Sequence, residues 1–175
     1  MARNIEIKAR IDSVDALLPR ARVVAGAQPQ LIEQDDRFFS VPHGRLKLRR
    51  FADGSAELIQ YHRPDGTDAR ASDYVRVAVP DADAMALALE RALGAAGRVR
   101  KQRWLLLAGQ TRIHLDRVDE LGDFMELEVV LRDGQSDAEG QAIAERLMQD
   151  LGLADAPRLS GAYVDLAPGS QAVTT

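Results

Sequence analysis

Short segments in which charged and apolar residues alternate with a period of two recur along the chain, and they constrain its fold more than any other feature. The first is Asn4-Ile5-Glu6-Ile7-Lys8, which places Glu6 and Lys8 on one face and Ile5 and Ile7 on the other. Side chains at i and i+2 share a face of a β-strand, so the pattern predicts a strand with one apolar and one charged face. For a single strand, a solvated surface position is the ordinary explanation.

Further segments of this kind follow at short spacing, and turn residues such as Asp53-Gly54 and Ala108-Gly109-Gln110 separate them. Successive hairpins predict an antiparallel sheet or barrel rather than a doubly wound α/β fold. We expect about seven or eight strands. The first strand is the segment described above. A segment over 35–39 leads into the next strand, and further strands are expected at 45–51, 57–63, 72–79, 99–107, 111–118 and 124–131.

Two or three helices are expected between these strands. Ser13 can cap the first, but Pro19 is badly placed within it, so this helix is expected to be short or broken. Apolar residues at four-residue spacing predict a second helix over about 80–93. A capping box formed by Ser136 and Glu139 predicts a third.

Composition limits the class of protein. With 175 residues and 46% hydrophobic residues, the chain fits one domain, expected over 1–168, with a loose tail over 169–175. The absence of cysteine excludes disulfides and thiolate metal sites. A net charge of −4 argues against broad nucleic-acid binding. No secretory signal is evident and no apolar run approaches the roughly 18 residues of a membrane span, so we expect a cytoplasmic protein without membrane contact.

Six strands with one charged face are harder to explain as surface strands than one. If the sheet closes with its aliphatic faces outward against the helices, its interior holds many cations and a smaller group of carboxylates. Because unpaired buried charges are costly, such an interior is expected to need a ligand. The charged faces carry Glu6, Lys8, Arg45, Lys47, Arg49, Lys101, Arg103, Arg112, Asp116, Glu126 and Glu128.

The residue types indicate which ligand. Arginine offers forked donors that match phosphate oxygens, and lysine offers a compact positive charge. A carboxylate group in the same cavity suggests Mg²⁺ or Mn²⁺ shared with the phosphates. His114 lies on the same face, where a site role and a structural role are equally open, and as a ligand it would favour Mn²⁺. The sequence therefore predicts a polyphosphate and a divalent metal.

The ordered set of motifs resembles a known family. E-x-K in the first strand is followed by L-K-L-R, K-x-R, R-x-H-x-D and E-L-E, and together they resemble the CYTH domains over residues 2–166. That family groups class IV adenylate cyclases with thiamine triphosphatases, within the triphosphate tunnel metalloenzymes. The resemblance implies an α+β fold, a closed antiparallel eight-stranded β-barrel with flanking helices, whose tunnel binds a triphosphate.

The resemblance also implies roles for individual residues. The triphosphate ligands are expected to be Lys8, Lys47, Arg49, Arg76, Lys101, Arg103 and Arg112. The metal ligands are expected to be Glu6, Asp116, Glu126 and Glu128, and the catalytic residues Glu6 and Lys8.

Two positions depart from the family pattern. The opening signature of the family is E-x-E-x-K, and here Asn4 stands in place of the first glutamate. This replacement keeps an oxygen ligand but removes a negative charge. This leaves open whether one or two metals bind. His62 stands where a lysine is often found, and it can donate to phosphate although it is mostly neutral at pH 7.

The expected function is that of a metal-dependent enzyme acting on a nucleoside or other organic triphosphate. Attack by water gives a triphosphatase, and attack by a ribose 3′-hydroxyl gives an adenylate cyclase and pyrophosphate. One alternative is a non-catalytic polyphosphate or nucleotide binder, and another is a lipocalin-like barrel with an apolar ligand. The sequence ranks none of the triphosphates, and an isologous homodimer is compatible with it.

Overall fold

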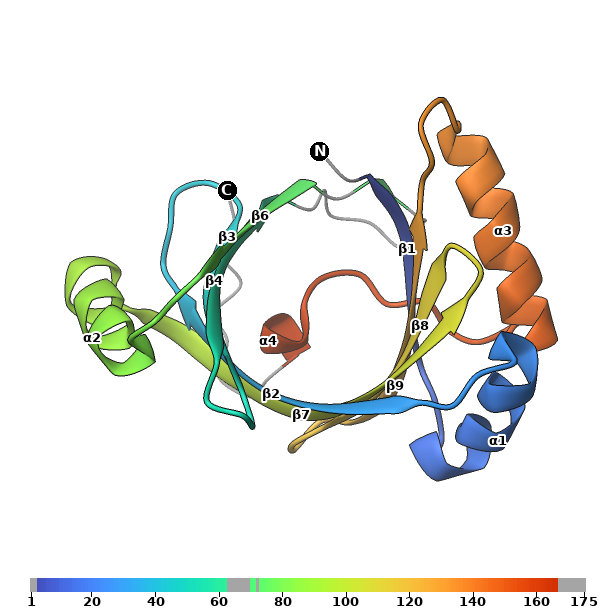
Figure 1. Ribbon diagram of the computed structural model, residues 1–175, viewed down its shortest axis with the longest axis horizontal. Helices are drawn as coiled ribbons and strands as arrows, with labels where there is room; N and C mark the ends of the chain where they lie inside the picture. Colours follow the sequence, from blue (N-terminus) through green and yellow to red (C-terminus); the bar gives the residue numbers. More distant parts are fainter. Residues whose placement is uncertain (1–2, 63–69, 72, 167–175) are drawn as a thin grey trace.

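The computed structural model describes residues 3–62, 70–71 and 73–166, and it forms a strongly curled antiparallel sheet with helices around it (Figure 1). Eight long strands and the two-residue β5 run in the order β5-β1-β9-β8-β7-β2-β3-β4-β6. The strands are β1 Asn4–Arg10, β2 Gln30–Phe39, β3 Arg45–Phe51, β4 Ala56–His62, β5 Arg70–Ala71, β6 Asp73–Ala78, β7 Ala95–Ala108, β8 Thr111–Val118 and β9 Gly122–Val130.

Four helices accompany the sheet among the described residues, namely α1 Val14–Ala25, α2 Ala82–Leu93, α3 Asp137–Asp150 and α4 Tyr163–Leu166. α1 and α3 lie outside the wall formed by β1, β8 and β9, and α2 lies outside β2 and β3 (Figure 1). The short α4 instead packs on the inner side of the curl, against β7. None of these described helices has the length and apolarity to cross a membrane.

The α+β class and the antiparallel sheet were predicted, but the predicted closure of the barrel was wrong. β5 pairs with β1 through only two residue pairs, β6 pairs with β4, and no ladder between described residues joins β6 to β1. The two edges therefore belong to strands that follow each other directly in the chain, at 70–71 and 73–78, rather than to strands that pair. The start of the expected strand 72–79 and the expected tail 169–175 lie outside the described residues.

The first helix corrects another prediction. α1 continues for 12 residues through Pro19, with Ser13 as its N-cap, although the proline predicts a short or broken helix. Proline removes one hydrogen bond inside a helix, at a cost of about 3 kcal/mol. The buried side chains of Val14 and Ala21, with partly buried neighbours on the same face, pack against the main core and offset this cost.

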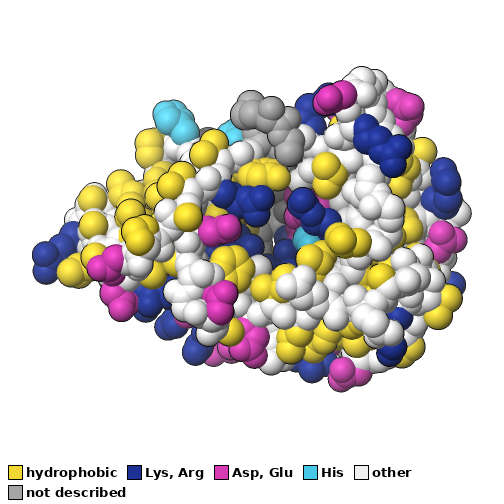
Figure 2. All heavy atoms as spheres, in the orientation of Figure 1, with side chains coloured by type: hydrophobic (Ala, Val, Ile, Leu, Met, Phe, Trp, Pro, Cys, Tyr) yellow, Lys and Arg dark blue, Asp and Glu magenta, His cyan; other side chains and the backbone are white. Residues whose placement is uncertain are grey.

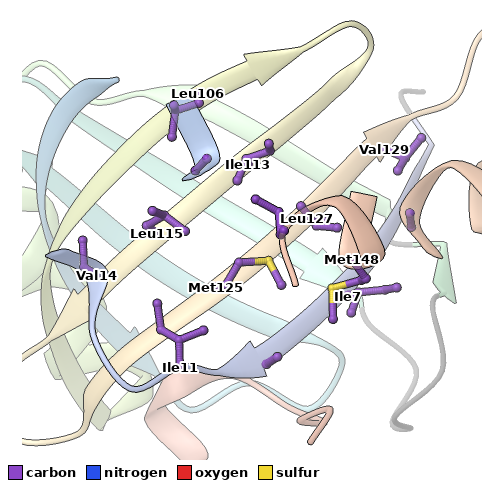
Figure 3. Packing of buried hydrophobic residues seen from close by; sticks show 14 of the residues in the cluster. Ile7, Ile11, Val14, Leu106, Ile113, Leu115, Met125, Leu127, Val129 and Met148 are labelled. Atoms are coloured by element: carbon purple, nitrogen blue, oxygen red, sulfur yellow. The ribbon is translucent and has the colours of Figure 1, made fainter. Parts of the chain in front are cut away.

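The main core lies between the convex face of the sheet and the helices α1 and α3 (Figure 3). Its strand members are the apolar residues of the alternating strands, so the outward aliphatic faces expected from the sequence are confirmed. The fully buried strand residues in it include Ile5, Ile7, Ile113, Leu115, Met125, Leu127 and Val129. Because the apolar faces point outward, the charged faces of the same strands point into the concave side.

α3 approaches β1 closely because Gly140 has no side chain. A Cβ atom at Gly140 would lie 2.5 Å from Leu131 Cδ2 and 2.7 Å from Ile5 Cγ1. Both neighbours lie in or against the main core, so neither can move without disturbing the packing.

We predict that Gly140→Val lowers the free energy of unfolding by about 1–3 kcal/mol, because overpacking forces α3 away from the sheet. Gln141→Val is the matched control, since Gln141 is the exposed neighbour on the same helix and tests valine propensity alone. Urea unfolding followed by circular dichroism measures both variants. Equal stability of the two variants would contradict the close approach of α3.

Candidate functional site

The concave face of the sheet encloses a cavity of about 360 Å³, and side chains from all eight long strands line it. Figure 2 shows Lys, Arg, Asp and Glu side chains gathered around a hollow near the centre of this face. The cations are Lys8, Lys47, Arg49, Arg76, Lys101, Arg103 and Arg112, and the acids are Glu6, Asp36, Glu57, Glu126 and Glu128. The lining therefore carries a small formal excess of positive charge.

All the residues expected as triphosphate ligands line this one cavity, although they come from five different strands. Strand register brings opposite charges together on the inner face. Lys8 lies opposite Glu126 across β1 and β9, and Arg112 lies opposite Glu128 across β8 and β9. Among the expected metal ligands, Glu6, Glu126 and Glu128 also line the cavity, whereas Asp116 lies behind the lining.

Asp116 is fully buried and forms the centre of a network of ion pairs. Arg103 donates two hydrogen bonds to its carboxylate, at 2.7 and 2.6 Å, and the Tyr163 hydroxyl donates another at 2.9 Å. Burial alone would raise the pKa of Asp116, but Arg103 and Lys101 outweigh it and hold this pKa well below its usual range. Asp116 thus orients Arg103, and both of its oxygens are engaged by protein donors.

Asp36 on β2 forms a second network, and the sequence analysis missed this residue. Its carboxylate accepts a hydrogen bond from Lys47 at 2.8 Å and two from Arg49, at 2.7 and 2.8 Å. Burial opposes ionisation, yet Lys47 and Arg49 hold the pKa of Asp36 far below its usual range. Gln34, Asp36 and Phe38 share one face of β2 and all line the cavity, but polar residues also occupy the other face, which hides the alternation.

These internal pairs correct the argument that the interior cations need a ligand. Four cations, Lys47, Arg49, Lys101 and Arg103, already lie within 4 Å of Asp36 or Asp116. The cavity is therefore close to compensated without a bound anion, and an anion that enters must compete with these carboxylates.

The pKa values of two interior lysines are lowered. Burial and the neighbouring Arg49 lower the pKa of Lys47 to about 8, although Asp36 acts in the opposite direction. Burial and Arg103 lower the pKa of Lys101 to about 7. Each lysine would regain its full charge next to an added anion.

The carboxylates of the lining include a close pair that fits a divalent cation. The side chains of Glu6 and Glu126 are hydrogen-bonded to each other, and Lys8 Nζ lies 3.8 Å from Glu126. Burial would raise the pKa of Glu126, but Lys8, the hydrogen bond with Glu6 and Arg103 hold it well below its usual range. A hydrogen bond between two carboxyl groups needs a proton on one of them, and a divalent cation bound at this place can replace that proton.

The donor set also has the right chemistry. Asn4 is buried in the lining and its Oδ1 atom has no hydrogen-bond partner. Among the described residues, no three His, Cys, Asp or Glu side chains are close enough to hold a metal by themselves. Mg²⁺ commonly binds one or two carboxylates and takes its remaining ligands from water and substrate phosphates. The residues therefore fit such an ion when a phosphate ligand completes the site.

His114 contributes a neutral imidazole to the lining. Burial and Arg103 lower the pKa of His114 to about 4, so the ring is uncharged at pH 7. Its Nδ1 atom is buried without a hydrogen-bond partner, 4.0 Å from Glu128 Oε1.

Two charged or polar residues near the site do not line the cavity. His62 is exposed at the end of β4, on the face opposite to Glu57, Ile59 and Tyr61, which line the cavity. Its match to a phosphate-binding lysine is therefore wrong. Arg45 makes a bidentate ion pair with Asp165 of α4, at 2.8 and 2.7 Å, and is not part of the lining.

The segment around Tyr163 closes one end of the cavity. The Tyr163 ring packs on Phe124 and lies 4.2 Å from Lys8 Nζ and 4.9 Å from Lys101 Nζ. Gly97 makes room for this segment, since a Cβ there would lie 2.5 Å from Val164 Cγ2. The cavity thus has an aromatic closed end beside its deepest cations.

Comparison with solved structures shows a shared fold across nearly the whole chain. PH1012 from Pyrococcus horikoshii has a TM-score of 0.82 at 24% identity, covering 93% of this chain and 98% of that one. A Vibrio parahaemolyticus protein that was proposed to be an adenylate cyclase has a TM-score of 0.74 at 21% identity, covering 94% and 98%. HpAC1 from Hippeastrum, a proposed adenylyl cyclase with a dominant triphosphatase activity, has a TM-score of 0.68 at 14% identity, covering 99% and 98%.

No curated protein matches this chain. The family profile described as CYTH domain, however, matches residues 2–163. Enzymes of the triphosphate tunnel type in that family are generally dependent on a divalent metal. With the eight curled antiparallel strands and the charged interior, this match shows that the chain belongs to the CYTH domain family.

Proposed function

We propose that this chain is a divalent-metal-dependent enzyme that acts on an organic triphosphate. The observation that carries the proposal is the convergence of seven cations and the close pair Glu6 and Glu126 in one cavity. A highly charged anion alone is poorly matched to a lining with only a small positive excess. A triphosphate that enters together with Mg²⁺ or Mn²⁺ brings less negative charge, and its phosphates complete the ligand shell of the metal.

The cations are proposed to bind the triphosphate through the donors that their carboxylate partners leave free. Lys47, Arg49, Lys101 and Arg103 keep their contacts with Asp36 and Asp116 on one side and offer remaining donors to phosphate oxygens. Arg112 and the exposed Arg76 extend this surface on β8 and β6. Since the carboxylates are buried behind or between the cations, they hold the donors in place before the ligand arrives.

The metal is proposed to bind Glu6 and Glu126, with Glu128 and the Asn4 Oδ1 atom nearby. When bound, such an ion neutralises charge that develops on phosphate oxygens. Lys8 is proposed as a catalytic residue, because it lies between this group and the closed end and can donate to the phosphate that accumulates charge. Asp116 is left out of the metal site, since Arg103 and Tyr163 occupy its oxygens.

Hydrolysis and cyclisation use the same phosphate-binding groups and differ in the nucleophile. The dominant triphosphatase activity of HpAC1 supports water as the nucleophile, and the proposal made for the Vibrio protein supports a ribose hydroxyl. A non-catalytic binder is the second candidate, because Asn4 removes one negative charge from the metal side of the cavity.

We predict that Lys8→Ala and Glu126→Gln each lower kcat/KM by about 100-fold, because the first removes a cation that faces the developing charge and the second removes a ligand of the metal. The assay uses ATP, inorganic triphosphate and thiamine triphosphate with Mg²⁺, Mn²⁺ or EDTA, and resolves cyclic AMP, pyrophosphate and phosphate. Arg100→Ala and Glu33→Ala are the controls, since both residues are exposed on the outer faces of β7 and β2. Binding without turnover in the unsubstituted protein would favour the non-catalytic candidate.

We predict that triphosphate binding weakens as pH rises through about 8. Free Lys47 loses its proton there, whereas a bound anion raises the pKa of Lys47, so binding above pH 8 takes up a proton. Calorimetry at pH 8.5 in buffers of different ionisation enthalpy measures this uptake. Lys47→Arg retains the charge at every pH and is expected to take up fewer protons. Equal proton uptake by both proteins would show that Lys47 does not titrate on binding.

A further inference from the structure

Three apolar side chains form a patch inside the charged cavity. Ile32 on β2, Phe51 on β3 and Leu105 on β7 all line it. Gln30 lies opposite Leu105 and Gln34 lies opposite Phe51, so Ile32 is the diagonal neighbour of both apolar residues. The three side chains are therefore contiguous across β7, β2 and β3.

Packing within the protein does not account for this patch. The three hydrophobic core clusters of the described residues contain neither Ile32, Phe51 nor Leu105, and all three side chains are half-buried. The apolar residues at the closed end differ in this respect, since Phe38 and Val99 are buried in a cluster with Tyr163.

The patch meets the charged part of the cavity at a sharp boundary. One step inward on the same faces, Phe51 is followed by Arg49 on β3 and Leu105 by Arg103 on β7. On β2 the step inward from Ile32 is Gln34, whose side-chain oxygen is buried without a hydrogen-bond partner. A ligand that spans this boundary would place an apolar group on the patch, a hydrogen-bond donor at Gln34 and its phosphates deeper inside.

We propose that Ile32, Phe51 and Leu105 bind the ring of a nucleoside triphosphate, and that Gln34 accepts a hydrogen bond from a hydroxyl of its sugar. The inference rests on the proposed function and narrows its substrate class, because inorganic triphosphate leaves the patch and the Gln34 oxygen unused. A flat apolar ring gains affinity by covering half-buried apolar side chains, which water otherwise contacts.

The test compares three ligands that differ by one part at a time, namely inorganic triphosphate, ribose 5-triphosphate and ATP. Dissociation constants are measured by calorimetry with Ca²⁺ as the divalent cation, which binds the same kind of oxygen ligands. We expect ATP to bind about tenfold more tightly than ribose 5-triphosphate. Phe51→Ala and Leu105→Asn are expected to reduce this ratio to about one, while the affinity for inorganic triphosphate changes by less than about twofold.

Gln34→Leu tests the second contact, and it is expected to weaken ribose 5-triphosphate relative to inorganic triphosphate by about fivefold. Tyr74→Leu is the control for the opposite wall, since Tyr74 also lines the cavity but lies on β6. Equal affinity of the unsubstituted protein for ATP and ribose 5-triphosphate overturns the inference. The inference is also overturned if Tyr74→Leu loses the preference for ATP while Phe51→Ala and Leu105→Asn keep it. Failure of all three ligands to bind refutes the proposed function instead.

Discussion

Pairing between interior cations and interior carboxylates is the constraint on which the rest of this structure depends. Arg103 is 7% exposed and pairs with both Asp116 and Glu126. Conversely, the carboxylate of Asp36 pairs with both Lys47 and Arg49. An unpaired buried charge costs several kcal/mol, so the concave face of the sheet can be this polar only because its buried cations lie next to carboxylates. The convex aliphatic face supplies the folding energy that the interior does not.

The same pairing decides how selective the cavity can be. A lining with a large positive excess would bind any polyanion, whereas a lining near neutrality favours a polyanion that brings a compensating cation with it. The metal-bound triphosphate of the proposed function would meet this requirement, because its oxygens would bind the cations while the metal would bind Glu6 and Glu126. Charge compensation in the empty cavity thus disfavours polyanions that enter without a cation.

Much of the wall of the cavity could be predicted from the sequence, and the exceptions have physical causes. Strict alternation identifies Lys8 and Glu126 as inward residues, because their strands have a plain apolar face. The segment Glu33 to Arg37 is polar on both faces, so its period of two is hidden and Asp36 was missed. Closure of the sheet could not be read from strand patterns either, since it depends on whether two edges pair. Strand alternation places Asp116 on the inner face, but it does not show that Arg103 and Tyr163 donate hydrogen bonds to its carboxylate.

The position of Tyr163 has a consequence for the order in which the protein matures. Its hydroxyl group bonds to Asp116 and its ring lies over Lys8 and Lys101, so three strands from the first 120 residues converge on one side chain near residue 163. During synthesis, the ribosome must release this late segment before the closed end of the cavity can form. A nascent chain can build the sheet earlier, but the end of the cavity beside Lys8 and Lys101 stays open until that moment.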